Sequence, residues 1–201
     1  MTKSFRLVQE FDIVDDYFGG DQMWFKSQYD VKTGCGPVAL ANTYAWFTQK
    51  PLSLADMKQL QEETLSYLQG PVLTPGKYIR GARKLFQSKG QKIESDSIII
   101  LGSGSVKRKE MILFISKSLE DNRPVALLLG PNNPRQELPH EEIYRKDFSS
   151  HWVLVTGLDV TGDDAVLYVS SWGKEFTLEL SRLMKSKLIL SCVSIKPLGK
   201  L

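Results

Sequence analysis

The residue best suited to nucleophilic chemistry is Cys35, which lies between two glycines in Gly34-Cys35-Gly36-Pro37. Pro37 suits the first turn of a helix, where its missing N–H group would have no partner. Cys35 is therefore expected at a helix N-terminus, where unpaired N–H groups and the helix dipole favour an anion. Such a setting lowers the pKa of a thiol and makes it a better nucleophile. We predict a catalytic role for Cys35, with a small buried hydrophobic residue as the alternative.

A cysteine nucleophile needs a base, and the sequence has two histidines, His140 and His151. His151 opens the apolar run His151-Trp152-Val153-Leu154-Val155, which is typical of a strand and would hold the imidazole rigidly. His140 lies in a polar stretch and is expected to be exposed. His151 is the candidate base, and the alternative is a hydrogen-bonded surface histidine.

The second cysteine, Cys192, lies in an apolar run and is expected to be a buried strand residue. Two cysteines far apart in the sequence do not form a disulfide framework, which favours a reducing compartment. No tight cluster of cysteine and histidine is present, so we expect no metal and no cofactor.

Composition sets the broad class of the protein. The chain has 201 residues, 42% of them hydrophobic and 24% charged, with a net charge of +3. These values are typical of one globular domain, and they point to no nucleic-acid partner. The N-terminal residues lack the apolar core of a signal peptide, and no apolar run reaches transmembrane length. We therefore expect no membrane insertion and a cytoplasmic location, with export by a signal-less route left open.

The elements that would position Cys35 and His151 follow an α+β pattern, with helices first and antiparallel strands later. We expect one domain with an N-terminal arm (1–27), a helical part (28–91) and a mainly sheet part (92–201). Helices are expected at about 37–48, after Ser53, after Thr74 and at about 106–120, and strands at about 92–101, 125–129, 151–158, 165–169 and 188–195. The long loop 130–150 is typical of a binding loop.

Four motifs follow one another along the chain: Gln28, Cys35-Gly36-Pro37, the strand that begins at His151, and Ser170-Ser171-Trp172-Gly173. In this order they resemble the motifs of papain-like cysteine peptidases, and among these the bacterial C39-like group. It implies a papain-like fold, with a helical lobe that carries the cysteine, a sheet lobe that carries the histidine, and a cleft between them.

The resemblance also implies roles for single residues. Gln28 matches the glutamine that binds the oxyanion together with the Cys35 N–H group, and His151 matches the base. The residues that would bind substrate or shield the catalytic pair from water are Gly34, Trp152 and Trp172. The implied function is a thiol hydrolase that cleaves peptide or isopeptide bonds in a peptide or protein substrate.

The sequence departs from the family at the residue that orients the histidine. The family has Asn or Asp where this chain has Ser170, whose oxygen could accept the ring N–H of His151. Asp159 cannot take this role, because it lies about 26 Å along the same strand from His151, each strand residue adding about 3.3 Å. Asp147 is a weaker candidate in the preceding loop. Three interpretations stay open: a Cys-His dyad helped by Ser170, a slow enzyme, or a binding protein on a peptidase scaffold. Acyl transfer and deamidation are further alternatives that use the same thioester.

Overall fold

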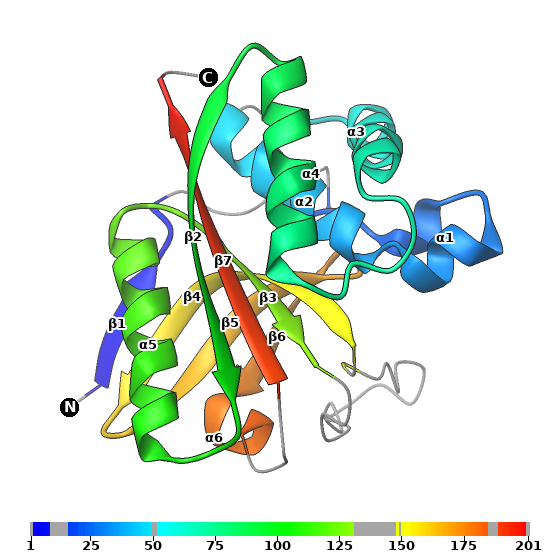
Figure 1. Cartoon of the computed structure of the whole chain (residues 1–201). Helices are drawn as coiled ribbons and strands as arrows, with labels where there is room; N and C mark the ends of the chain where they lie inside the picture. Colours follow the sequence, from blue (N-terminus) through cyan, green and yellow to red (C-terminus); the bar gives the residue numbers. More distant parts are fainter. Residues whose placement is uncertain are drawn as a thin grey trace.

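The structure is a computed structural model that describes residues 2–8, 16–49, 52–130, 148, 150–184 and 189–199. Helices come first along the chain, and most strands follow. The helices are α1 (Gln28–Thr33), α2 (Cys35–Thr48), α3 (Leu54–Tyr67), α4 (Pro75–Ser88), α5 (Ser105–Glu120) and α6 (Leu180–Leu183), with a short 3₁₀ helix η1 (Gln22–Trp24) before them. In Figure 1, α1 to α4 gather on one side of the picture and α5 lies on the other. The α+β class is confirmed.

The strands form a single antiparallel sheet around β4 (His151–Thr161). The other strands are β1 (Thr2–Arg6), β2 (Lys92–Leu101), β3 (Val125–Leu129), β5 (Asp164–Ser171), β6 (Lys174–Glu179) and β7 (Ile189–Leu198). Their order is β2-β7-β3-β4-β5-β6, and β1 pairs with the second half of β4. The first half of β4 pairs with β3, with Leu129 opposite His151. His151 therefore starts a strand that has neighbours on both sides.

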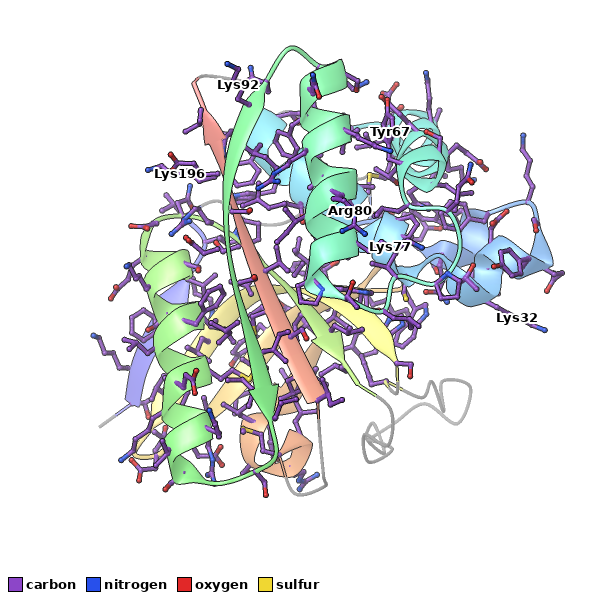
Figure 2. The ribbon with its side chains drawn as sticks, viewed as in Figure 1. Lys32, Tyr67, Lys77, Arg80, Lys92 and Lys196 are labelled. Atoms are coloured by element: carbon purple, nitrogen blue, oxygen red, sulfur yellow. The ribbon has the colours of Figure 1, made fainter. Side chains whose placement is uncertain are left out.

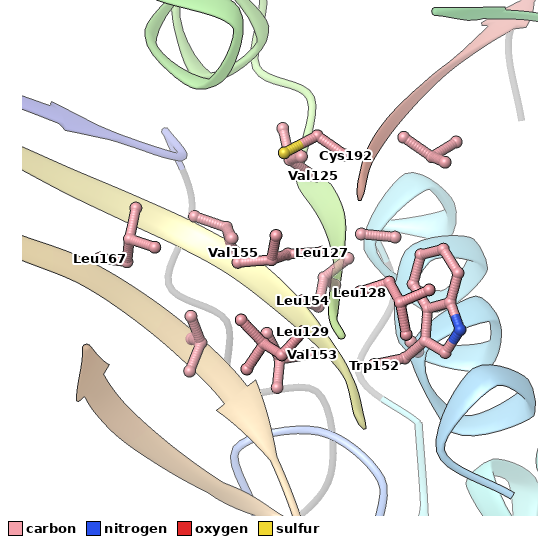
Figure 3. Close-up of a cluster of buried hydrophobic side chains, with 14 of the residues drawn as sticks. Val125, Leu127, Leu128, Leu129, Trp152, Val153, Leu154, Val155, Leu167 and Cys192 are labelled. Carbon is pink, nitrogen blue, oxygen red and sulfur yellow. The ribbon is translucent and has the colours of Figure 1, made fainter. Parts of the chain in front are cut away.

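The core is densest where β3 and the first half of β4 meet the helices. All residues of β3 are buried, and so are His151 to Leu158 in β4. Figure 3 shows this cluster, with Trp152 turned from β4 toward the helical layer and Cys192 deep among aliphatic side chains. Burial raises the pKa of the Cys192 thiol to about 12. The predicted structural role of Cys192 is confirmed.

Helix α2 is buried over most of its length, because it packs against β4 on one side and against α3 and α4 on others. Helices α3 and α4 begin at the predicted capping residues. Ser53 and Asp56 form a reciprocal capping box, and the Thr74 hydroxyl accepts the Lys77 N–H group before Pro75 opens α4. These caps place the helices that hold α2 against the sheet.

Helix α1 and strand β6 are among the elements that were not predicted from the sequence. Helix α1 begins at Gln28, where Ser27 accepts the N–H groups of Tyr29 and Asp30. Strand β6 follows a two-residue turn after β5. Phe176 and Leu178 are its only buried residues, and the other residues of the strand are exposed. It is an edge strand with few apolar residues, which leaves little periodic signal.

Basic side chains lie on several elements of the surface. Figure 2 shows Lys32, Arg80, Lys92 and Lys196, which are all exposed and come from α1, α4, β2 and β7. None of the helices in the described ranges is both long and apolar enough to cross a lipid bilayer.

Candidate active site

Cys35 is the first residue of α2, and Gly34 is its N-cap. The glycines on both sides are required by close packing. A Cβ on Gly34 would overlap the Phe25 ring and the Asp30 carbonyl, and a Cβ on Gly36 would overlap the Val72 side chain. Gly34, predicted to bind substrate, is buried and lets α1 and α2 pack closely.

Cys35 and His151 line the same small cavity of about 10 Å³, which is about the room that one water needs. The lining residues come from four segments of the chain that are distant in sequence. They are Gln22, Cys35, Val38, Ala39, Asn42, His151, Trp152, Ser170, Ser171 and Trp172. No carboxylate is among these described lining residues. The fold therefore brings the candidate nucleophile and the candidate base to one place.

Burial raises the pKa of the Cys35 thiol above its ordinary value of 9.0. The backbone N–H groups of Trp152, Gly36 and Cys35 itself donate toward the sulfur and lower the pKa, but by less than burial raises it. The sequence predicted a depressed pKa from the helix N-terminus. That prediction is wrong for this structure, because α2, β4 and the segment before α1 close around the sulfur and remove water from it.

The imidazole of His151 is buried and held by two neighbours. Its Nε2 atom lies 2.8 Å from the Ser171 Oγ atom. Its ring stacks on the Trp172 indole, with centroids 4.2 Å apart and planes 12° from parallel. Phe148 meets the imidazole edge-on at 5.9 Å. The ring is thus fixed in its plane by a hydrogen bond and covered on one face by the indole.

The serine that contacts the His151 ring is Ser171, whereas the predicted Ser170 has other partners. The Ser170 hydroxyl donates to the Phe18 carbonyl at 2.7 Å and accepts from Asn42 Nδ2 at 3.2 Å. Successive residues of a strand point to opposite faces, so the two serines at the end of β5 reach different partners.

Asp159 and Asp163 have other partners in the structure. Asp159 pairs with Arg6 at 3.0 Å in the second half of β4, and Asp163 pairs with Lys109 at 3.0 Å. Asp147 and His140 lie outside the described residues.

Trp172 reaches His151 through an unusual backbone conformation. It occupies the left-handed region with φ of 48°, and Gly173 follows with φ of 68°. Ser171 pairs with Lys174 across the turn, so the two residues form a hairpin loop with positive φ at both positions. A bulky residue there costs about 1–3 kcal/mol, a strain that is typical of functional sites. Phe148 and Phe176 pack edge-on against the indole and hold it in place.

The candidate oxyanion donor is also a different residue from the one predicted. Gln28 is exposed in the first turn of α1, whereas Gln22 lines the cavity beside Cys35. Gln22 Nε2 donates one hydrogen to the Val31 carbonyl at 2.8 Å, and a side-chain amide carries a second. The sequence signal that could have pointed to Gln22 is the nearby pair Gly19-Gly20, because neighbouring glycines indicate a segment whose backbone passes close to other parts of the chain.

Trp152 anchors the site from behind. Its indole N–H donates to the Val72 carbonyl at 2.6 Å, and its ring stacks on Tyr78 at 4.6 Å. The Tyr78 hydroxyl in turn lies 3.0 Å from the Thr43 hydroxyl. Only 2% of Trp152 is exposed, so its side chain is anchored in the core. This anchoring holds in place the backbone N–H group of Trp152, which donates toward the Cys35 sulfur.

Within the described ranges, no group of three or more His, Cys, Asp or Glu side chains is arranged to hold a metal ion.

One solved structure gives an independent view of the fold. A crystal structure described as UfSP from C. elegans is similar to this chain, with a TM-score of 0.51 and 12% sequence identity. The similarity covers 84% of this chain and 31% of that one, so this chain spans about a third of the length of its structural neighbour. No protein-family model matches the sequence, and no curated protein matches it either. The helical layer carrying Cys35 and the antiparallel sheet carrying His151 are thus a papain-like α+β fold.

Proposed function

We propose that this protein is a papain-like thiol hydrolase that cleaves peptide or isopeptide bonds through an acyl-thioester on Cys35. The observation that carries the proposal is the shared cavity, in which Cys35 from α2 meets His151 from β4 while Ser171 holds the imidazole. A nucleophile, a base and a group that orients the base are the parts such a reaction needs. The papain-like fold supports the same reaction class by analogy.

The reaction starts from a neutral thiol, because burial disfavours the thiolate. His151 accepts the thiol proton at Nδ1 as the sulfur attacks the substrate carbonyl, and its Nε2–H group donates to Ser171. The carbonyl oxygen becomes an oxyanion that accepts hydrogen bonds from the second amide hydrogen of Gln22 and from the Cys35 backbone N–H group. The imidazolium then protonates the leaving amine, and the carbon–nitrogen bond breaks to leave a thioester.

Hydrolysis of the thioester restores the enzyme. His151 takes a proton from a water molecule as the water oxygen attacks the thioester carbonyl. The carbon–sulfur bond breaks, the carboxylic acid leaves, and the proton returns to the sulfur. If an amine or hydroxyl replaces this water, the same thioester gives acyl transfer.

Among the described residues the group beside Nε2 of His151 is a serine, and activity with such a partner has a physical basis. Ser171 fixes the plane of the imidazole, and the π face of Trp172 stabilises the positive charge that His151 gains during the reaction. Catalytic triads also tolerate loss of the orienting residue better than loss of the nucleophile or the base. The rival proposal is a binding protein on the same scaffold, which the raised pKa of Cys35 favours.

Hydrolysis of p-nitrophenyl acetate separates these proposals, because this small activated ester acylates a nucleophilic thiol directly and releases a coloured product. We expect a burst of nitrophenolate and an acetylated Cys35 by peptide mass spectrometry. Cys35→Ala and His151→Ala should abolish the burst, and Cys192→Ala, which changes a buried core thiol, should retain it. Equal rates for the wild type and Cys35→Ala would contradict the proposed function.

The biological context of the proposed reaction is drawn from the sequence. A peptide or protein substrate, a cytoplasmic location and a particular relationship to the C39-like group all stay predictions.

A further inference from the structure

A buried polar pair lies beside the catalytic cavity and takes no part in the chemistry described above. Asn42 in α2 and Ser170 at the end of β5 are each 1% exposed, and Asn42 Nδ2 donates to Ser170 Oγ at 3.2 Å. Buried polar side chains weaken a core unless their hydrogen bonds are satisfied by specific partners. The partners of this pair therefore indicate what it does.

Both side chains of the Asn42–Ser170 pair bind the backbone of one segment, residues 18–21. The Ser170 hydroxyl donates to the Phe18 carbonyl at 2.7 Å, and Asn42 Oδ1 accepts the Gly20 N–H group at 2.8 Å. Gly20 is also bound through its carbonyl, which accepts the Gly173 N–H group at 3.0 Å. The segment is thus fixed to α2 and to the turn after β5.

The segment leads directly into Gln22, the candidate oxyanion donor. Gln61 of α3 holds the intervening residue, because its side-chain amide donates to the Asp21 carbonyl at 3.0 Å. Gly19 passes so close to the pair that a Cβ there would overlap Ser170 Oγ and Asn42 Nδ2, and its φ is 85°. The path of the segment therefore leaves no room for a shift toward α2 or β5.

We propose that Asn42 and Ser170 are positioning residues that set the place of the Gln22 amide in the oxyanion site. This inference rests on the proposed thiol hydrolase function. The pair joins three of the elements that take part in the proposed reaction: α2 with Cys35, β5 with Ser171, and the segment that leads into Gln22. Small displacements of a donor lower the rate strongly, because oxyanion stabilisation depends on geometry.

The test compares two reactions of the same thiol. Hydrolysis of p-nitrophenyl acetate passes through an oxyanion, whereas alkylation of Cys35 by iodoacetamide does not. We expect Ser170→Ala to lower kcat about tenfold with KM unchanged, and to change the alkylation rate less than about twofold. The matched control is Ser194→Ala, because Ser194 is a fully buried serine whose hydroxyl has no hydrogen-bond partner among the described residues. It should leave both rates unchanged.

A double-variant cycle shows whether Ser170 acts through Gln22. Gln22→Ala alone should lower kcat about 10²–10³-fold, and adding Ser170→Ala should lower it no further. Gly19→Ala leaves both residues of the pair unchanged in the sequence but pushes the segment away from them, because its Cβ would overlap Ser170 Oγ and Asn42 Nδ2, and it should reproduce the loss in kcat. Multiplicative losses in the double variant, or alkylation slowed as much as hydrolysis, would overturn the inference and leave the proposed function intact. Wild-type activity in Cys35→Ala would overturn both.

Discussion

The rings of His151 and Trp172 lie face to face, with centroids 4.2 Å apart and planes 12° from parallel. The contact exists because Trp172 occupies a left-handed turn position that a bulky residue adopts only at a cost of about 1–3 kcal/mol. The stacking excludes water from one face of the base and places π electrons against its developing charge. In the proposed reaction, this stack takes over part of the stabilisation of the imidazolium that an orienting carboxylate would give.

Replacing Trp172 tests the contribution of the stacked indole. We expect Trp172→Leu to lower kcat/KM for p-nitrophenyl acetate about tenfold, since leucine keeps apolar bulk but offers no π face. Trp46→Leu is the control, because Trp46 is a buried tryptophan of α2 that lies outside the cavity lining. Both variants should lose thermal stability, and only Trp172→Leu should lose activity at a temperature where each is folded. Equal activity of the two variants would contradict the role of the stack.

Replacing Ser171 tests the orientation of the imidazole. Ser171→Ala removes the 2.8 Å contact to Nε2 and lets the ring rotate, so we expect kcat to fall about tenfold. Here the loss should extend to alkylation of Cys35 by iodoacetamide, because deprotonation of the thiol also depends on His151. Full activity in Ser171→Ala would show that another residue orients the base.

The raised pKa of Cys35 predicts how the free enzyme reacts with electrophiles. Burial favours the neutral thiol, so alkylation by iodoacetamide should be slow near neutral pH and should accelerate as the pH rises beyond 9.0. The measurement uses a Cys192→Ala background and follows the mass of the protein over time. A rate that is already at its plateau near neutral pH would show a preformed thiolate, contrary to this expectation.

Acid stability should depend on Asp159. The hydrogen bond from Arg6 is the main cause that lowers the pKa of this carboxyl from 3.8 to about 2. The folded state therefore favours the ionised form, and this stabilisation is full above pH 3.8 and is lost as the pH falls toward about 2. Asp159→Asn should reduce the free energy of unfolding by about 1 kcal/mol at neutral pH, because solvent screens part of the interaction.

Urea unfolding between neutral pH and about pH 2 checks this prediction. The Asp159→Asn variant should show a flatter decline in stability across the acid range than the wild type. Asp163→Asn is the control, since the ion pair of Asp163 with Lys109 is more than half exposed on both sides. Identical pH profiles for the wild type and Asp159→Asn would contradict the role of the Arg6 contact.

Much of the fold could be predicted because its signals are local. Ser53 and Thr74 mark the starts of α3 and α4, and the turn at Gly162 and Asp163 marks the hairpin of β4 and β5. Each of these signals depends on residues within one turn or one hairpin. Strand β6 has few apolar residues, and helix α1, although Ser27 caps it, is only six residues long, so both were found only in the structure.

The site could be predicted only in part, because its details depend on distant segments. Cys35 and His151 were identified by residue type, and the structure brings them together. The choice between Ser170 and Ser171 depends on which way each side chain points at a strand end, where a shift of one residue reverses the direction. The place of Gln22 depends on Asn42 and Gln61, which contact its segment from two helices.

The distance in sequence between Cys35 and His151 has a consequence for how the site forms during synthesis of the chain. Cys35 belongs to an early helix, whereas the base and its orienting serine lie in β4 and β5, near the end of the sheet. During synthesis from the N-terminus, the thiol emerges long before the strands that complete the site. The growing chain therefore carries an ordinary cysteine, and the proposed hydrolase site is complete only after β4 and β5 have folded against α2.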